Sequence, residues 1–473
     1  MTPGLPSGAL SARDIARAVR EGRVSVEAVR ARAEARLAEV AGLQAVCQRL
    51  DPPIRLSKSP GVSSEMMSGV PLLVKDLSFP VAGEICASGC GFPAVPARAH
   101  AVLLQRYLEA GAQVLGRSHS PELGGGSACE SRHWGLATRN PYAPARSSGG
   151  SSGGAAVAVA TGAVPIAHAS DAGGSITIPA ALCGVVGLKP THGTHETVIP
   201  LGPDRIEGAA GFAAQNALTR DMGDAALALA VGAARPGLAR IAPVGRLRIG
   251  LALQAVDGGP TEAGIAARLG ALAGTLRALG HEVAEVRMPA LTEQVAAAER
   301  ALRLAALAAT VAGMETAAGL AAEAGHFEPA TWARIEAGRR VSGVEVLQAR
   351  DAVLRWAAGV EALFARHDVI LTPALNAPAP PVQALSLMRP DAETQPLNRH
   401  YTCFTRPWNL TGLPSLCLPL LRDGAGRPEG ALFAAGPGQE ALLLSLGTQL
   451  EEAVGWRHDH LETVFAEEDQ GED

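Results

Sequence analysis

The sequence predicts an α/β fold in which a mixed, twisted central sheet is covered by helices on both faces. Short apolar runs typical of buried strands are spread along the chain, and helical patterns lie between them. No linker rich in Pro, Gly and Ser separates independent halves, and no internal repeat is visible. We therefore expect one domain over residues 1–465, and we expect the acidic tail AEEDQGED (466–473) to be disordered.

Two helices and a buried strand are predicted in the N-terminal part. Ser11 and Asp14 form a capping box, and Gly22 ends the first helix. A second helix begins at Ser25. The apolar run GVPLLVKD (69–76) follows a polar, proline-containing passage and fits a buried strand.

The next segment combines regular elements with a long loop. An amphipathic helix over 99–110 precedes the strand AQVLG (112–116), and we expect residues 117–152 to be a loop. Residues 153–162, GGAAVAVATG, have small side chains throughout, which predicts a helix buried on all sides.

The C-terminal half resumes the alternation of strands and helices. A strand (247–253), a helix (261–279) and a strand (282–286) form one unit, and helices dominate 291–365. The remaining predicted elements are a strand (368–374), the loop NLTGLPS (409–415), another strand and a closing helix (442–454).

Composition and charge exclude several function classes. A net charge of −5 with 47% hydrophobic residues is typical of a globular protein, and it indicates neither a nucleic-acid partner nor a membrane partner. The first residues contain no leader pattern, so we expect a cytoplasmic protein. Seven scattered cysteines without a CxxC pair predict reduced, mostly buried thiols. We expect no metal and no organic cofactor, because no metal-ligand spacing is present.

Lysine is rare in this chain. Of 41 basic residues only three are lysine: Lys58, Lys75 and Lys189. Lys75 falls at or just past a strand end among apolar neighbours, a position where the function of a lysine would depend on an amine that can lose its proton. Lys189 is interpreted as a solvated or loop-anchoring cation.

The stretch GGSSGG (149–154) has three interpretations. A flexible linker is disfavoured, because the stretch runs directly into the buried small-residue helix. A GxSxG nucleophile elbow centred on Ser151 needs an apolar strand before it, and RNPYAPARSS cannot supply a strand of useful length. The third interpretation combines this stretch with Ser175 in DAGGS (171–175) and with Lys75 in a single site.

These motifs resemble the amidase signature family. GVPLLVKD, GLATRNP, GGSSGG, DAGGSITIPA and CGVVGLKPT follow one another in family order over 69–191, and weaker similarities occur at ILTPA (370–374) and NLTGLP (409–414). The stretch HASDAGGS (168–175) is most similar to the bacterial amidases that include the 6-aminohexanoate cyclic dimer hydrolases. The resemblance implies the amidase signature fold, with 69–191 as its core.

The resemblance also implies catalytic roles. Ser175 would be the nucleophile that forms an acyl-enzyme, and Ser151, after a cis peptide bond from Gly150, would relay its proton to Lys75. Lys75 can act as the general base only if it is neutral, and burial would lower its pKa in that direction. The backbone N–H groups of the nucleophile loop would form the oxyanion hole, with contributions from Ala172, Gly173, Gly174 and Ser175.

Three further residues are predicted to support the site. Ser152 is expected to hold the loop by hydrogen bonds, and Asp171 to tie the loop together. Thr177 stands where the family usually has an arginine, so Asp171 lacks that ion-pair partner. An unpaired buried carboxylate would be costly or protonated, so either another arginine reaches it or the loop is arranged differently.

The function expected from the resemblance is hydrolysis of a carboxylic amide in a small molecule. An amidotransferase-type subunit that needs partner chains is the alternative within catalysis. A catalytically inactive scaffold is the alternative from another class, and the intact Lys75, Ser151 and Ser175 argue against it. Pocket residues are expected from 123–129, the segment after His192 and the helices between 301 and 350. The oligomeric state is left open, with a homodimer as one possibility.

Overall fold

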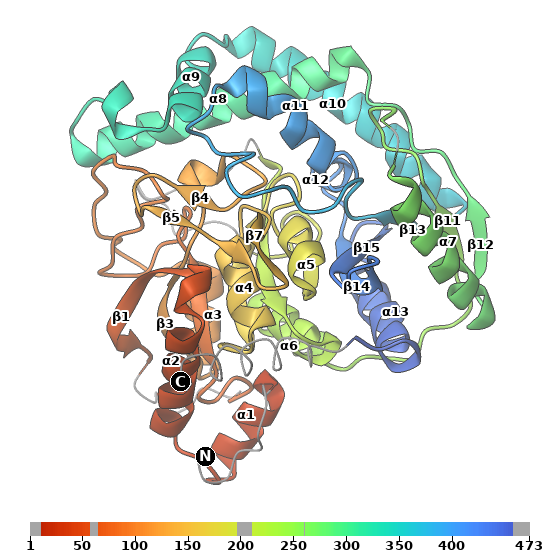
Figure 1. Cartoon of the computed structure of the whole chain (residues 1–473), viewed down its shortest axis with the longest axis horizontal. Helices are drawn as coiled ribbons and strands as arrows, with labels where there is room; N and C mark the ends of the chain where they lie inside the picture. Colours follow the sequence, from red (N-terminus) through yellow and green to blue (C-terminus); the bar gives the residue numbers. More distant parts are fainter. Residues whose placement is uncertain (1–10, 57–64, 196–210, 260, 457–473) are drawn as a thin grey trace.

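A mixed sheet of eleven strands organises the molecule (Figure 1). The computed structural model describes residues 11–56, 65–195, 211–259 and 261–456, so Lys58 and the tail 466–473 lie outside the described residues. The strand order is β1-β3-β2-β8-β10-β9-β14-β15-β13-β11-β12. In chain order the strands are β1 (Val46–Ile54), β2 (Pro71–Lys75), β3 (Gln113–Ser118), β8 (Ile166–Asp171), β9 (Val186–Lys189), β10 (Ala214–Thr219), β11 (Arg248–Leu251), β12 (Glu282–Glu285), β13 (Val369–Pro373), β14 (Ser415–Arg422) and β15 (Pro428–Ala435).

The predicted mixed character of the sheet is confirmed. β2 runs parallel to β3 and β8, and β11 runs parallel to β12 and β13, whereas the other neighbouring strands pair antiparallel. Strands from both ends of the chain therefore share one sheet. Because the carboxyl ends of parallel neighbours lie at the same edge, Lys75 at the end of β2 and Asp171 at the end of β8 are brought together.

Helices surround this sheet. The first two begin where the sequence predicts, because the side chains of Ser11 and Ser25 accept hydrogen bonds from the N–H groups of Asp14 and Ala28. The α-helices are α1 (Ala12–Arg20), α2 (Val26–Glu39), α3 (Val102–Glu109), α4 (Gly153–Ala160), α5 (Thr177–Cys183), α6 (Met222–Gly232), α7 (Ala263–Ala278), α8 (Glu293–Ala318), α9 (Pro329–Gly338), α10 (Gly343–Glu361), α11 (Asp391–Thr402), α12 (Arg406–Leu410) and α13 (Glu440–Ala453).

Both faces of the sheet are covered, as predicted. Successive side chains of a strand point to opposite faces, so Cys417 of β14 belongs to the hydrophobic cluster that contains α4 and α5. Its neighbours Leu416 and Leu418 belong to the cluster that contains α6, α7 and α13. Each face therefore has its own helical layer.

The segment expected to be a loop, 117–152, contains more structure than predicted. Two small antiparallel sheets lie within it, formed by β4 (Glu130–Ser131) with β5 (Leu136–Ala137), and by β6 (Arg139–Asn140) with β7 (Ala143–Ser147). The prediction that RNPYAPARSS cannot supply a strand of useful length is therefore wrong, since five of its residues form β7. Because β7 pairs with β6 outside the main sheet, it does not present Ser151 at a central strand end.

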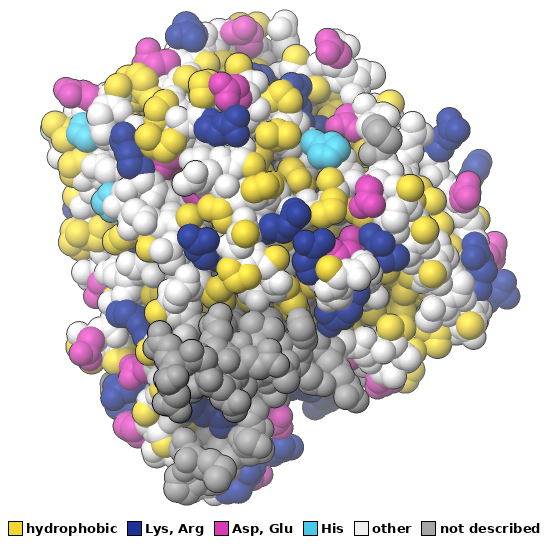
Figure 2. Space-filling model, viewed as in Figure 1, with side chains coloured by type: hydrophobic (Ala, Val, Ile, Leu, Met, Phe, Trp, Pro, Cys, Tyr) yellow, Lys and Arg dark blue, Asp and Glu magenta, His cyan; other side chains and the backbone are white. Residues whose placement is uncertain are grey.

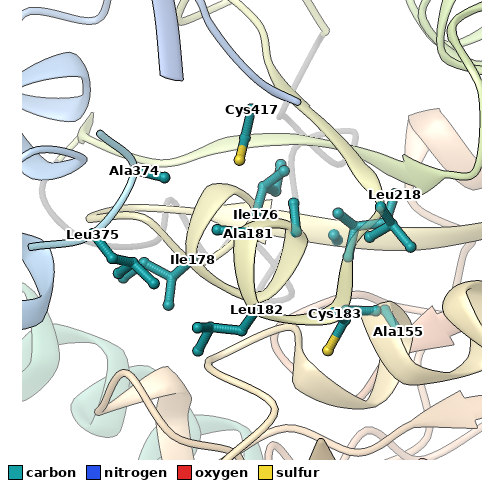
Figure 3. Packing of buried hydrophobic residues seen from close by; sticks show 14 of the residues in the cluster. Ala155, Ile176, Ile178, Ala181, Leu182, Cys183, Leu218, Ala374, Leu375 and Cys417 are labelled. Atoms are coloured by element: carbon teal, nitrogen blue, oxygen red, sulfur yellow. The ribbon is translucent and has the colours of Figure 1, made fainter. Parts of the chain in front are cut away.

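The two helices next to the glycine–serine motifs lie in the core. All residues of α4 are buried, as predicted from its small side chains. Figure 3 shows that α5 is surrounded by apolar side chains, with Leu375, Leu218 and Cys417 coming from other parts of the chain. The loops that precede these helices are therefore anchored to rigid elements.

The long helices α8 and α10 lie along the top of the view in Figure 1, and α8 packs against both α9 and α10. In Figure 2, acidic and basic side chains are interspersed over one face, with a group of Lys and Arg side chains near its middle. None of the helices in the described ranges is long and apolar enough to cross a membrane.

Candidate active site

A buried lysine amine lies among three serines. Lys75 is fully buried at the end of β2. Its Nζ lies 2.7 Å from Ser151 Oγ, 2.9 Å from Ser152 Oγ and 3.1 Å from Ser170 Oγ. The carbonyl oxygen of Ser170 lies 3.3 Å from the same Nζ. The amine is thus held by hydrogen bonds, and no carboxylate of the described residues is in direct contact with it.

Burial lowers the pKa of Lys75 to about 7, and the more distant Cys129 and Asp171 oppose this shift to a smaller extent. The predicted direction is confirmed. Next to the lysine, the backbone N–H of Lys75 donates to Nδ1 of His168 over 3.2 Å. Burial lowers the pKa of His168 to about 3, so this ring is neutral at ordinary pH and adds no charge beside the amine.

The stretch GGSSGG is a rigid turn into α4. Its serines are 0–1% exposed, which excludes a flexible linker. The peptide bond between Gly150 and Ser151 is cis, as the resemblance implies. A Cβ at Gly150 would collide with the backbone of Ala128, so the close approach of two chain segments requires glycine there.

Ser175 lies on the loop between β8 and α5. It is half-buried and lines the same cavity as Ser151, and its carbonyl oxygen accepts a hydrogen bond of 3.2 Å from the N–H of Ser152. Within the described residues, no hydrogen bond joins the hydroxyl groups of Ser151 and Ser175. The structure thus brings together the three predicted catalytic residues, with Lys75 and Ser151 in direct contact.

Asp171 organises the nucleophile loop through the backbone. Its Oδ1 accepts from the N–H of Gly173 at 3.2 Å and of Gly174 at 2.6 Å. Its Oδ2 accepts from the N–H of Ile176 at 2.7 Å and of Thr177 at 3.2 Å. The concern about a missing arginine partner is therefore resolved, because four N–H groups balance the buried carboxylate.

This arrangement bears on the predicted oxyanion hole, which stays a prediction. The N–H groups of Gly173 and Gly174 already donate to Asp171, so they are not free donors. Ala172 and Ser175 supply the two predicted amides that do not bind this carboxylate. Those two amides are therefore the first candidates for the predicted oxyanion hole.

The carbonyl groups of the same loop are held from other elements. Arg303 Nη2 of α8 donates to the carbonyl of Ala172 over 2.8 Å, and Thr405 Oγ1 donates to that of Gly173 over 2.8 Å. Asn409 Nδ2 of α12 donates to the carbonyl of Asp171 over 3.0 Å. The sequence prediction missed these supports, because residues more than a hundred positions away carry no local signal.

Ser170 was also missed, although it directly precedes Asp171 in HASDAGGS. Its contact with Lys75 follows from the parallel pairing of β2 and β8. Of the two interpretations of Lys189, the solvated cation is wrong, because the residue is 1% exposed, and the loop-anchoring cation remains. Its Nζ donates to the carbonyl of Pro190 over 3.1 Å, and burial lowers its pKa to about 8.

The site opens into a cavity of about 520 Å³. Residues 123–127 and α8 line it, as predicted, whereas the contribution of α11 was not predicted. Most of the segment after His192 lies outside the described residues. A second cavity of about 400 Å³ is mostly apolar and shares Ser78, Leu123 and Thr310 with the first. Across the described ranges, no group of three or more His, Cys, Asp or Glu side chains is placed to hold a metal ion.

Comparisons with known proteins agree with the fold. The family model described as Amidase matches residues 54–444. The 6-aminohexanoate-cyclic-dimer hydrolase of Paenarthrobacter ureafaciens is 32% identical over 469 residues, covering 93% of each chain. A solved structure of a 6-aminohexanoate cyclic dimer hydrolase complexed with substrate superposes with a TM-score of 0.83 at 29% identity, covering 94% of this chain and 97% of that one. A bacterial aryl acylamidase of 22% identity has the same fold, with a TM-score of 0.83 over 99% of this chain and 100% of that one.

Proposed function

The chain belongs to the amidase signature family and is an amide-hydrolysing enzyme, and on that premise we propose that Ser175, Ser151 and Lys75 carry out the hydrolysis. The observation that carries the proposal is the hydrogen bond of 2.7 Å between Lys75 Nζ and Ser151 Oγ in a fully buried position, on the wall of the cavity that Ser175 also lines.

Acylation begins with neutral Lys75. Ser175 Oγ attacks the amide carbonyl carbon while its proton passes to Ser151 Oγ, whose own proton passes to Lys75 Nζ. The negative charge that develops on the carbonyl oxygen is stabilised by backbone N–H groups of the loop, first those of Ala172 and Ser175. When the C–N bond breaks, the leaving nitrogen takes the proton back from Lys75 through Ser151.

Deacylation repeats these proton transfers with water. A water molecule attacks the Ser175 ester, its proton passes through Ser151 to Lys75, and the carboxylic acid leaves as Ser175 regains a proton. Lys75 thus acts as base and then as acid in each half-reaction. Its lowered pKa suits both tasks, because a group that titrates near working pH exchanges protons most readily.

The substrate is a small-molecule amide that fits the cavity of about 520 Å³. The 6-aminohexanoate cyclic dimer named for the relatives is a candidate, supported by 32% identity over nearly the whole chain. Residues 1–465 form one amidase domain around the 69–191 core in this proposal. A cytoplasmic location and a homodimer stay predictions.

Covalent trapping tests the nucleophile. Treatment with a fluorophosphonate followed by peptide mapping should place one adduct on Ser175, and Ser175→Ala should remain unlabelled. Ser148→Ala is a matched control outside the proposed triad and should still be labelled. An adduct on Ser151 would show that Ser151 is the nucleophile and that the proton relay is wrong.

Substitution of the base tests the rest of the mechanism. Lys75→Ala should keep the circular dichroism spectrum of the parent and lose amide hydrolysis by at least about a thousandfold. Full activity of a folded Lys75→Ala enzyme at neutral pH would exclude Lys75 as the base.

A further inference from the structure

One wall of the main cavity is unusually basic. Helices α8, α9, α11 and α12 contribute five arginines to its lining: Arg300, Arg303, Arg334, Arg399 and Arg406. Two carboxylates are shared among four of them. Glu299 binds Arg303 at 2.8 Å and Arg406 at 3.4 Å. Asp391 binds Arg300 at 3.2 Å and Arg334 at 2.6 Å. Each carboxylate therefore leaves one positive charge uncompensated.

The fifth arginine has no carboxylate partner in the described part of the chain. Arg399 is exposed at the cavity on α11, with its side chain free of ion pairs there. It lies on a polar helix face at i, i+3, i+4 and i+7 spacing, which also presents Gln395, Asn398 and Thr402 to the cavity. Two acids of the lining form no ion pair with the described residues: Asp171, whose carboxylate is bound by backbone N–H groups, and Glu293 at the start of α8.

Buried donors without partners lie next to this face. Arg334 is 8% exposed and Asn398 is 9% exposed. Arg334 Nη1 donates to the carbonyl of Gly125, and Asn398 Oδ1 accepts from the N–H of Ser127 over 3.0 Å. Arg334 Nη2 and Asn398 Nδ2 nevertheless have no hydrogen-bond partner among the described residues. Both donors therefore flank residues 125–127, which line the cavity.

These unpartnered donors indicate which chemical group a ligand would present to them. A buried N–H without an acceptor costs on the order of 1–3 kcal/mol, so a ligand acceptor at this position would be favoured. A carboxylate offers only acceptors, and it matches guanidinium geometry and charge better than a hydroxyl or an amide does. The surplus positive charge on the same wall favours an anion over a neutral acceptor.

We propose that the substrate carries a free carboxylate, which binds between α11 and residues 125–127, at Arg399, Arg334 and Asn398, while the scissile amide lies at Ser175. The inference rests on the proposed function for the chemical step alone. The amide substrate is accordingly an amido acid, with the carboxylate on either the acyl or the amine side. This inference disfavours the 6-aminohexanoate cyclic dimer as the substrate of this chain, because a cyclic diamide has no free carboxylate.

Equilibrium binding tests the carboxylate independently of turnover. Monoanilides of succinic, glutaric and adipic acid and N-benzoyl ω-amino acids of matching length are titrated calorimetrically into the Ser175→Ala enzyme. Each is compared with analogues in which a methyl group or a primary amide replaces the carboxylate. The best carboxylate ligand should bind at least about tenfold more tightly than both analogues, and its affinity should fall with added salt.

Arg399→Gln in the same background should abolish that preference, whereas the matched control Arg355→Gln on α10, which does not line the cavity, should keep it. Equal binding of all three end groups would overturn the proposal. Primary amides that bind as tightly as carboxylates would overturn its anionic part, and a preference that survives Arg399→Gln would overturn its location. Preferential binding without any hydrolysis by the enzyme with intact Ser175 would contradict the proposed function and leave the carboxylate site established.

Discussion

Acidification should switch the enzyme off through Lys75. Because burial lowers the pKa of Lys75 to about 7, the neutral base is present above that pH and is protonated below it. The fraction of neutral lysine falls about tenfold per pH unit, to about one-hundredth at pH 5. We therefore expect kcat/KM for a neutral anilide to follow a single acid limb with a midpoint near pH 7 and a plateau above pH 8.

Other groups near the site are distinguishable in the same assay. Burial lowers the pKa of His119 to about 4 and that of His168 to about 3, so neither titrates near the midpoint. Burial raises the pKa of Glu122 to about 7, and this residue directly precedes Leu123 of the cavity wall. Glu122→Gln keeps an acceptor for the N–H of Glu328, so it serves as the control, and its acid limb should be unchanged.

Initial rates from pH 5 to 9.5 at constant ionic strength measure this limb. A midpoint below about pH 5, or a profile that stays flat with chemistry rate-limiting, would refute the assignment of Lys75 as the base. Loss of the limb in Glu122→Gln would assign it to that carboxyl instead.

Three further predictions concern stability and the nucleophile loop. Lys75→Met should lack the pH-dependent stability of the parent, because between pH 7 and 10.5 the unfolded lysine binds a proton that the folded one lacks. The free energy of unfolding of the parent should therefore rise by about 1.4 kcal/mol per pH unit relative to that of Lys75→Met. Denaturation midpoints of the two proteins that run parallel from pH 7.5 to 9.5 would contradict this. Thr405→Val removes the hydrogen bond of 2.8 Å to the carbonyl of Gly173 and should lower kcat by up to about tenfold with the melting temperature changed little; an unaltered kcat would show that this support is dispensable. Gly154→Ala would drive a Cβ into neighbouring backbone, so it should prevent soluble expression or lower the free energy of unfolding by several kcal/mol. In the control Gly274→Ala a Cβ meets nothing within 4 Å, so this change should stabilise α7 by up to about 1 kcal/mol. Equal melting temperatures of the two variants would contradict this packing.

Local patterns were sufficient for most elements. Helix starts such as Ser11 and Ser25 depend on one side chain and the next few N–H groups, so the sequence alone predicts them. The buried strand ending at Lys75 and the all-buried α4 follow from runs of apolar or small residues. Segment 117–152 was mispredicted because three of its strands have only two residues, and the five-residue β7 is mostly not buried, so none of them leaves a clear apolar pattern.

The sequence likewise predicts only part of the candidate site. Contiguous motifs, whose order is visible in the sequence, contain Lys75, Ser151, Ser175 and Asp171. The cis peptide bond before Ser151 was predicted through the family resemblance. How Asp171 is balanced was not predictable, because its partners are backbone N–H groups whose direction depends on the turn. The motifs predict the chemistry, and the turn determines which amides of the loop are not bound to Asp171.

The sequence by itself therefore determined the fold class, the family and the residues that we propose act on the amide, since each depends on short contiguous patterns. Only the tertiary structure decided what surrounds them. Ser170 reaches Lys75 through strand register, and Arg303 and Thr405 reach the nucleophile loop from distant helices. The basic wall with Arg399 likewise arises because α8, α9, α11 and α12 converge on one cavity. Such convergence is set by packing between segments far apart in the chain, which leaves no pattern within any one of them.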